Sequence, residues 1–210
     1  EFPVAAAQDD LALFSAIQAR FLSITFNMDN ANVPFFGDKA VRQALYYGLN
    51  RDALVEEVAL GLGVVAHSPL LPENWAYNAK IPHYAYDQAL AKQLLDGAGW
   101  VDSNGDGVRE KNGAPLQFLL YSSDEALQTA LIQRIALDWQ AIGVRVEPTP
   151  IAFVSLMSDF LQPRKFDAAL TVWDIPGDPD QYWLWHSTQI EEGGLNYAGW
   201  RNEEVDDLLQ

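Results

Sequence analysis

The sequence contains no cysteine and few cations, with 13 Lys and Arg against 29 Asp and Glu among 210 residues, a net charge of −16. The lack of cysteine excludes a disulfide framework, a zinc knuckle, a thiol nucleophile and an iron–sulfur site. The lack of any basic run excludes nucleic acid as a partner, because that footprint needs clustered Lys and Arg. No apolar run approaches the roughly 18 residues needed to cross a membrane, and Glu1–Asp10 has no signal-peptide pattern.

Catalytic motifs are also lacking. The three histidines lie far apart without metal-ligand spacing, and the sequence has neither a G-x-S-x-G elbow nor a P-loop. We therefore predict a protein that is not an enzyme and carries no cofactor. Two alternatives stay open: a secreted hydrolase of peptides or glycans built on paired carboxylates, and a module that docks a receptor or chaperone through an exposed apolar patch.

Predicted strands alternate with predicted helices, which favours an α/β fold with a mixed central sheet flanked by helices. Hydrophobic residues make up 49% of the chain, enough for a sizeable core. The helix Asp124–Ile142 has an apolar stripe of Leu127, Leu131, Ile135, Trp139 and Ile142. The strands are predicted at Phe21–Phe26, Leu116–Tyr121, Val144–Pro148 and Phe166–Trp173. The further helices are predicted at Asp9–Ala19, Asp38–Leu49, Asp87–Leu95, Ala152–Leu161 and Asp178–His186, together with one that starts at Asn50 or Asp52 and ends before Gly61. A long irregular stretch is predicted at Val64–Tyr86.

Several segments, read in order, resemble bacterial extracellular solute-binding proteins of family 5, which include oligopeptide, dipeptide and nickel binders. The segments are Phe36–Leu45 with Gly48–Asp52, Ser68–Pro72 with Trp75, Ala91–Leu95 with Ala98–Trp100, Asp106–Glu110, Asp178–Asp180 and Asn202–Asp206. The resemblance implies a type II periplasmic-binding-protein-like lobe. We expect residues 1–210 to be one C-terminal lobe, cut at both ends and without its N-terminal lobe.

The resemblance also implies a function. Such a lobe closes with its partner on a small solute, here a peptide or similar compound, and delivers it to the permease of an ABC importer. It implies an extracellular or periplasmic monomer, with a lipid anchor upstream of this segment. Because an α/β lobe binds small molecules beyond the carboxyl ends of its strands, the candidate residues are sought there.

The first candidates follow the last predicted strand. Trp173 is a possible stacking platform, with core packing as the alternative, and in peptide-binding relatives an Asp near this point accepts hydrogen bonds from the peptide ammonium. Asp174 is the best match, although the segment is shorter than in those relatives; a capping or turn role is the alternative.

Further candidates are Tyr121, Ser122 and Ser123, where relatives contact ligand, with an N-cap role for Ser123 or Asp124 as the alternative. Dipeptide-binding relatives place a basic residue nearby, and its absence here favours longer peptides or uncharged solutes. Trp185, His186 and Asn196 belong to an aromatic and amide-rich segment suited to stacking, or else to packing on the lobe. A nickel chelate would require His186 to face the cleft.

The segment Asp102–Gly107 matches the start of a calcium loop, with oxygen ligands at Asp102, Asn104 and Asp106. The twelfth position, which should be Glu, is Gly113, although Glu110 is a possible substitute. A hydrogen-bonded turn is therefore the preferred interpretation, and no metal is predicted.

Overall fold

A four-stranded sheet forms the centre of the chain, of which the computed structural model describes residues 18–175 and 177–210. The predicted helix Asp9–Ala19 lies almost wholly outside the described residues. The strands follow the order β1-β6-β4-β5. Their bounds are Arg20–Phe26 for β1, Gln117–Ser123 for β4, Arg145–Ile151 for β5 and Ala168–Asp174 for β6.

The sheet is mixed, as predicted. Strand β4 runs parallel to both β5 and β6, whereas β1 runs antiparallel to β6. The carboxyl ends of β4, β5 and β6 consequently point the same way, and the start of β1 lies beside the end of β6, where Arg20 is the register partner of Asp174. A short hairpin of β2 (Glu110–Lys111) and β3 (Ala114–Pro115) projects at the opposite end.

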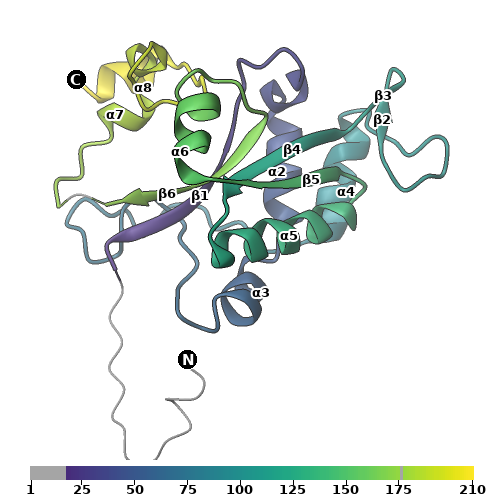
Figure 1. Cartoon of the computed structure of the whole chain (residues 1–210), viewed down its shortest axis with the longest axis horizontal. Coiled ribbons are helices and arrows are strands. Elements are labelled where there is room, and N and C mark those ends of the chain that lie inside the picture. The colour runs from purple at the N-terminus through teal and green to yellow at the C-terminus, as the bar shows by residue number, and fades with distance from the viewer. Residues whose placement is uncertain (1–17, 176) are drawn as a thin grey trace, which may run out of the picture.

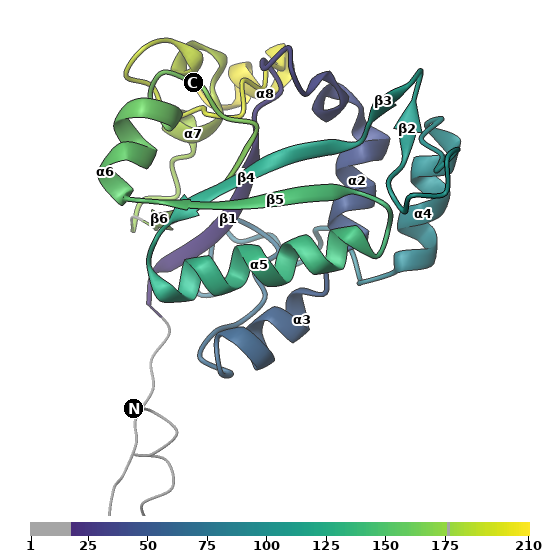
Figure 2. The same cartoon turned by 45° about the vertical axis from the view of Figure 1, so that its right-hand side comes forward.

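Helices cover both faces of the sheet. Figures 1 and 2 show α5 beneath the sheet and α6 above it, with the C-terminal segment on the side of α6. Helices α3 and α6 continue in wider π-type turns through Val58 and Leu161. The helix bounds are Lys39–Tyr47 for α2, Arg51–Ala53 for α3, Gln88–Gly97 for α4, Ala126–Gln140 for α5, Phe153–Ser155 for α6, Tyr182–Trp185 for α7 and Glu203–Leu208 for α8.

Side-chain caps start three of these helices where they were predicted. Asp38, Asn50 and Asp87 each accept a hydrogen bond from a backbone N–H in the first turn of α2, α3 and α4. The predicted start of α5 is wrong, because Glu125 stands at its N-cap position without a side-chain cap bond, so neither Ser123 nor Asp124 caps it. Leu127 is exposed, unlike the rest of the predicted stripe.

The larger apolar cluster joins α5, α2 and one face of the sheet. Trp139 is almost completely buried, its ring lies near those of Phe26 and Phe118, and its Nε1 donates to the carbonyl of Leu45 at 2.8 Å. A smaller cluster, which includes Tyr121, Phe166 and Tyr197, covers the other face. No helix among the described residues has the length and apolar character of a membrane span.

Truncation of Trp139 should destabilise the fold strongly. Trp139→Ala should lower the free energy of unfolding by about 3–5 kcal/mol, because it leaves a cavity and removes the hydrogen bond to Leu45. Leu137→Ala is the matched control on the same helix, since Leu137 is exposed; it should change stability by about 0.5 kcal/mol or less. Urea unfolding measures both, and equal effects would contradict the assignment of α5 to the core.

The irregular stretch Val64–Tyr86 packs on the lobe, as predicted. Arg51 holds its two ends by donating to the carbonyls of Ala66 and Tyr84 at 2.9 and 3.1 Å. The adjacent histidines stack, with the rings of His67 and His83 at 3.8 Å between centroids and 4° between planes. Burial lowers the pKa of His67 below its usual value, and the charges of His83 and Arg51 lower it further, against a small opposing effect of Asp52.

The histidine stack should make this loop sensitive to acid. Above a pH of about 6.5, the ordinary histidine pKa, His67 is neutral in both the folded and the unfolded chain, and the stack contributes its full stability. As the pH falls below about 6.5, the unfolded chain binds the proton first, so stability is lost as the pH falls through the lowered folded pKa. Proton NMR should place the midpoint of His67 below 6.5.

The variant His67→Phe is the control, because it keeps a stacked ring without the titrating group. Between pH 7.5 and 5.5 it should lose less thermal stability than the wild-type chain. A midpoint for His67 at or above 6.5 would refute the effect.

Candidate functional site

The carboxyl ends of the parallel strands meet at one edge of the sheet, where Ser123, Ile151 and Asp174 are the last strand residues. Tyr121 and Trp173 both join the smaller apolar cluster, so the two predicted strand ends lie on the same face. The structure therefore brings the two predicted groups to one edge. The side chains at the end of β4, however, are less exposed to solvent than those at the end of β6.

The end of β4 is closed. Tyr121, Ser122 and Ser123 are all buried, and Tyr121 packs against Phe160 with 4.7 Å between ring centroids. Burial raises the pKa of the Tyr121 hydroxyl, and the nearby carboxylates of Asp167 and Glu147 raise it further. The Ser122 hydroxyl donates to the carbonyl of Ser123, whereas the buried Ser123 Oγ has no partner among the described residues. In this conformation the three side chains are buried beneath the edge, and their contact with a solute stays a prediction.

The end of β6 is open. Trp173 is half-buried, and its Nε1 donates to Ser23 Oγ at 3.1 Å while one face of the indole lies near Tyr197. Asp174 is exposed, and its Oδ1 accepts a hydrogen bond from Arg20 Nε at 2.8 Å. Both predicted candidates of β6 therefore lie at the surface, although the Asp174 carboxylate already has a cationic partner within the chain.

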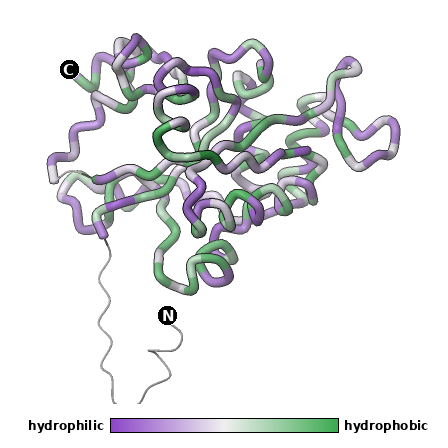
Figure 3. Tube along the Cα trace, in the orientation of Figure 1, coloured by the Kyte–Doolittle hydropathy of each residue, from purple (hydrophilic) through white to green (hydrophobic). Residues whose placement is uncertain are grey.

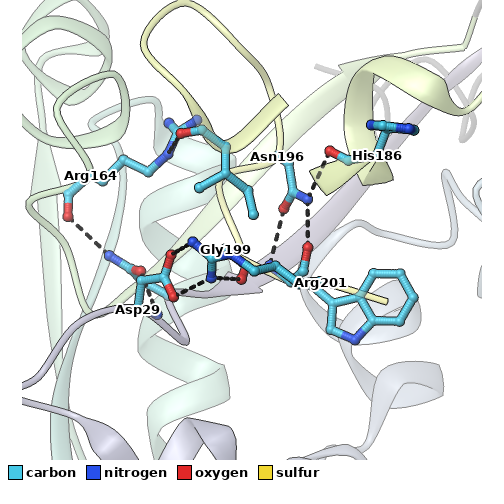
Figure 4. A network of polar contacts seen from close by, with 9 residues as sticks. Asp29, Arg164, His186, Asn196, Gly199 and Arg201 are labelled. Atoms are coloured by element: carbon cyan, nitrogen blue, oxygen red, sulfur yellow. Dashed lines mark hydrogen bonds and ion pairs between the residues drawn. The ribbon is translucent and has the colours of Figure 1, made fainter. Parts of the chain in front are cut away.

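In the third predicted group, one side chain is likewise exposed and two are buried. Trp185, in α7, is exposed, whereas His186 is only 5% exposed and Asn196 is fully buried. The Asn196 amide donates to the carbonyls of Trp185, His186 and Trp200 and accepts from the Trp200 N–H. Figure 4 shows this amide among the backbone groups it joins. Asn196 therefore holds the segment around α7 in place, and the buried His186 does not meet the condition for a nickel chelate.

Sequence reasoning missed two residues that build this region. Arg164 donates to the carbonyls of Gln189, Ile190 and Gly194, and its guanidinium lies 4.9 Å from the centre of the Tyr197 ring. Arg20 pairs with Asp174 at the edge of the sheet. Neither residue belongs to a motif, and the only signal for Arg20 is its place at the start of a strand.

The loop before β2 gathers oxygen atoms, but most of them bond within the loop. Carboxylate oxygens of Asp102, Asp106 and Glu110 lie within 4.8 Å of one another. Asp102 accepts from two backbone N–H groups of the turn, and Glu110 accepts from Asn104 and Ser103. Figure 3 shows this projecting loop as hydrophilic. The preferred interpretation of a hydrogen-bonded turn agrees with these contacts.

Two concavities lie away from the edge. The larger, of about 760 Å³, is near the amino ends of β4 and β5 and is lined by Phe35, Trp100 and Glu147 among others. The smaller, of about 210 Å³, is lined by Arg51, His67 and His83. Neither has a predicted site residue in its lining, so the edge at β6 is the open surface that carries the predicted chemistry.

Comparison with known proteins identifies the family and the fold. The family described as bacterial extracellular solute-binding proteins, family 5 Middle, matches residues 2–192. The chain belongs to this family. The resemblance inferred from the order of the motifs is confirmed, and so is the fold class.

Individual relatives agree with this assignment. The oligopeptide-binding protein AppA of Bacillus subtilis (strain 168) is 32% identical to this chain. The alignment covers 100% of this chain and 39% of AppA. The structure of AppA from Bacillus subtilis in complex with a nonapeptide superposes with a TM-score of 0.88, covering 99% of this chain and 41% of that one. The structure of NikZ from Campylobacter jejuni in complex with Ni(L-His) gives a TM-score of 0.85 at 27% identity. The match covers 99% of this chain and 41% of the NikZ chain. The chain thus spans about two fifths of the length of these family 5 relatives.

Proposed function

We propose that this chain is a solute-binding lobe of a family 5 protein that captures oligopeptides or similar solutes and delivers them to the permease of an ABC importer. The observation that carries the proposal is the open end of β6, where a half-buried indole and an exposed ion pair lie at the strand edge of the lobe. The AppA fold, which this lobe shares along 99% of its length, was solved with a nonapeptide bound.

Solute capture by this proposal needs a second lobe. The chain covers only about two fifths of its relatives, and the rest of the protein would supply the opposing wall of the cleft. Affinity would come from burying the solute between the walls, with few polar groups setting its orientation. The proposal also includes a monomer outside the cell membrane or in the periplasm, with a lipid anchor upstream. A secreted hydrolase is not favoured, because the matching relatives are named as binding proteins.

The proposal predicts bound solute in the full-length protein. Material purified without refolding, then denatured and analysed by mass spectrometry, should release peptides. Trp173→Ala should lower their occupancy about tenfold, because the indole offers a large apolar contact at the open strand end.

Two controls separate binding from folding. Trp173→Phe keeps a ring while losing the hydrogen bond to Ser23, and Leu137→Ala changes an exposed side chain on α5; both should retain most of the bound peptide. Melting curves confirm that each variant is folded. Release of no peptide from wild-type protein, together with no binding of added peptides, would refute the function.

A further inference from the structure

A contiguous apolar segment follows the carboxyl end of β5. Ile151 is the last residue of the strand, Ala152 precedes α6, and Phe153 and Val154 begin its first turn. Phe153 and Val154 are 59% and 75% exposed. No polar side chain stands between Pro150 and Val154. Helix α6 therefore begins with two large apolar side chains in contact with solvent, and exposed apolar surface of this kind is typical of binding sites.

The start of α6 also lacks the polar cap that four other helices carry. An Asp or Asn side chain caps α2, α3, α4 and α8, whereas Ala152 at the N-cap position of α6 makes no side-chain hydrogen bond. Ser, Thr, Asp and Asn are the residues that stabilise this position. A stable fold is expected to violate such local rules at functional surfaces, and here the violation keeps polar side chains away from the first turn.

Buried residues further along the helix fix this turn in place. Leu156 and Leu161 are 3% and 1% exposed and belong to the smaller apolar cluster, against which Trp173 also packs. The ring of Phe160 lies 4.7 Å from the ring of Tyr121, which is a member of the same cluster. The exposed turn therefore extends the face of the sheet on which Trp173 lies.

Strand register relates this turn to the indole of Trp173. Tyr121 of β4 pairs with Thr149 of β5 on one side and with Ala169 of β6 on the other. Phe153 and Trp173 each follow that partner by four residues, so both lie beyond the end of β4. Two interstrand spacings, about 10 Å in all, separate β5 from β6. Figure 2 shows α6 starting at the end of the sheet where β4 leads into α5, so the turn is continuous with the edge that the proposed function assigns to solute.

An extended peptide matches this spacing. In the polyproline II conformation the backbone advances about 3.1 Å per residue with three residues per turn, so side chains three residues apart point the same way and lie about 9 Å apart. A peptide with one side chain on Trp173 would thus bring the side chain three residues away to Phe153 and Val154. A polar side chain would gain nothing there, because the segment offers no donor or acceptor side chain. The surface therefore favours an apolar occupant.

We propose that Phe153 and Val154 determine solute specificity by receiving an apolar side chain three residues away from the side chain that contacts Trp173. The inference rests on the proposed function and deepens it, because it names the peptides that the lobe prefers. These peptides carry apolar side chains at positions i and i+3. Phe153 supplies the larger contact, and Val154 completes the apolar surface.

Calorimetric titration of the full-length protein tests this with three hexapeptides. Ala-Leu-Ala-Ala-Leu-Ala has leucines three residues apart, Ala-Leu-Leu-Ala-Ala-Ala has the same composition with adjacent leucines, and Ala-Leu-Ala-Ala-Ala-Ala has one leucine. The wild-type protein should bind the first about tenfold more tightly than the other two, because only the first buries a second leucine side chain. Phe153→Ser should remove this advantage and leave the other two affinities within about twofold, since the two contacts are separate.

Two variants serve as controls. Phe153→Leu keeps an apolar side chain and should retain the preference for the spaced leucines. Leu137→Ser removes a side chain that is 61% exposed, close to the exposure of Phe153, but it lies in the last turn of α5, away from the edge at which α5 begins. It should leave all affinities unchanged. Melting curves should show every variant folded, because the substituted side chains are exposed.

The outcomes separate the inference from the function. Equal binding of the spaced and adjacent leucine peptides by the wild-type protein, or a preference that persists in Phe153→Ser, overturns the role of Phe153 and Val154 while peptide capture stands. Equal weakening of every peptide in Phe153→Ser also overturns it, in favour of contact between this turn and the second lobe. Failure of the wild-type protein to bind any of the peptides overturns peptide capture itself, and the inference with it.

Discussion

The arrangement of the lobe depends on how β6 is held beside β4. Only two residue pairs, Leu120 with Ala168 and Tyr121 with Ala169, set this parallel register. The Asp167 carboxylate extends the contact by accepting from the Leu119 N–H at 3.0 Å and from the Asn30 amide at 2.8 Å. The fully buried Asn27 amide adds bonds to the carbonyls of Arg164 and Phe166. Because a slip of one residue would exchange the two faces of β6, these polar contacts decide which side chains reach the edge.

That register has a direct consequence for the site. It places Tyr121 and Trp173 on one face, where they share a cluster with Tyr197, and leaves the last residues of β6 beyond the end of β4. The buried end of β4 then acts as a support, and the projecting end of β6 acts as a surface. The buried amide of Asn196 and the Arg164 guanidinium stabilise the neighbouring C-terminal segment by joining backbone carbonyls that would otherwise be unpaired.

The chemistry of the open edge comes from an antiparallel strand pair. In an α/β lobe one looks for ligand-binding groups in the loops after parallel strands. Here β1 runs the opposite way, so its first residue, Arg20, reaches the same edge as the last residue of β6. The edge thereby gains a cation that pairs with Asp174, in a chain whose net charge is −16. A search restricted to strand ends in the sequence overlooks a strand start.

The sequence alone determined the local structure. The caps at Asp38, Asn50 and Asp87, the apolar period of α5 and the continuous apolar run of β6 are set by neighbours within a few residues, so the positions of these elements were predictable to within a few residues. The order of the family motifs likewise identified the family. The tertiary structure alone decided exposure and pairing: that Ser123, His186 and Asn196 are buried, that Leu127 is exposed, and that Asp174 meets Arg20 from 154 residues away. Those outcomes depend on strand register and on which helix covers which face, and neither is encoded in a local pattern.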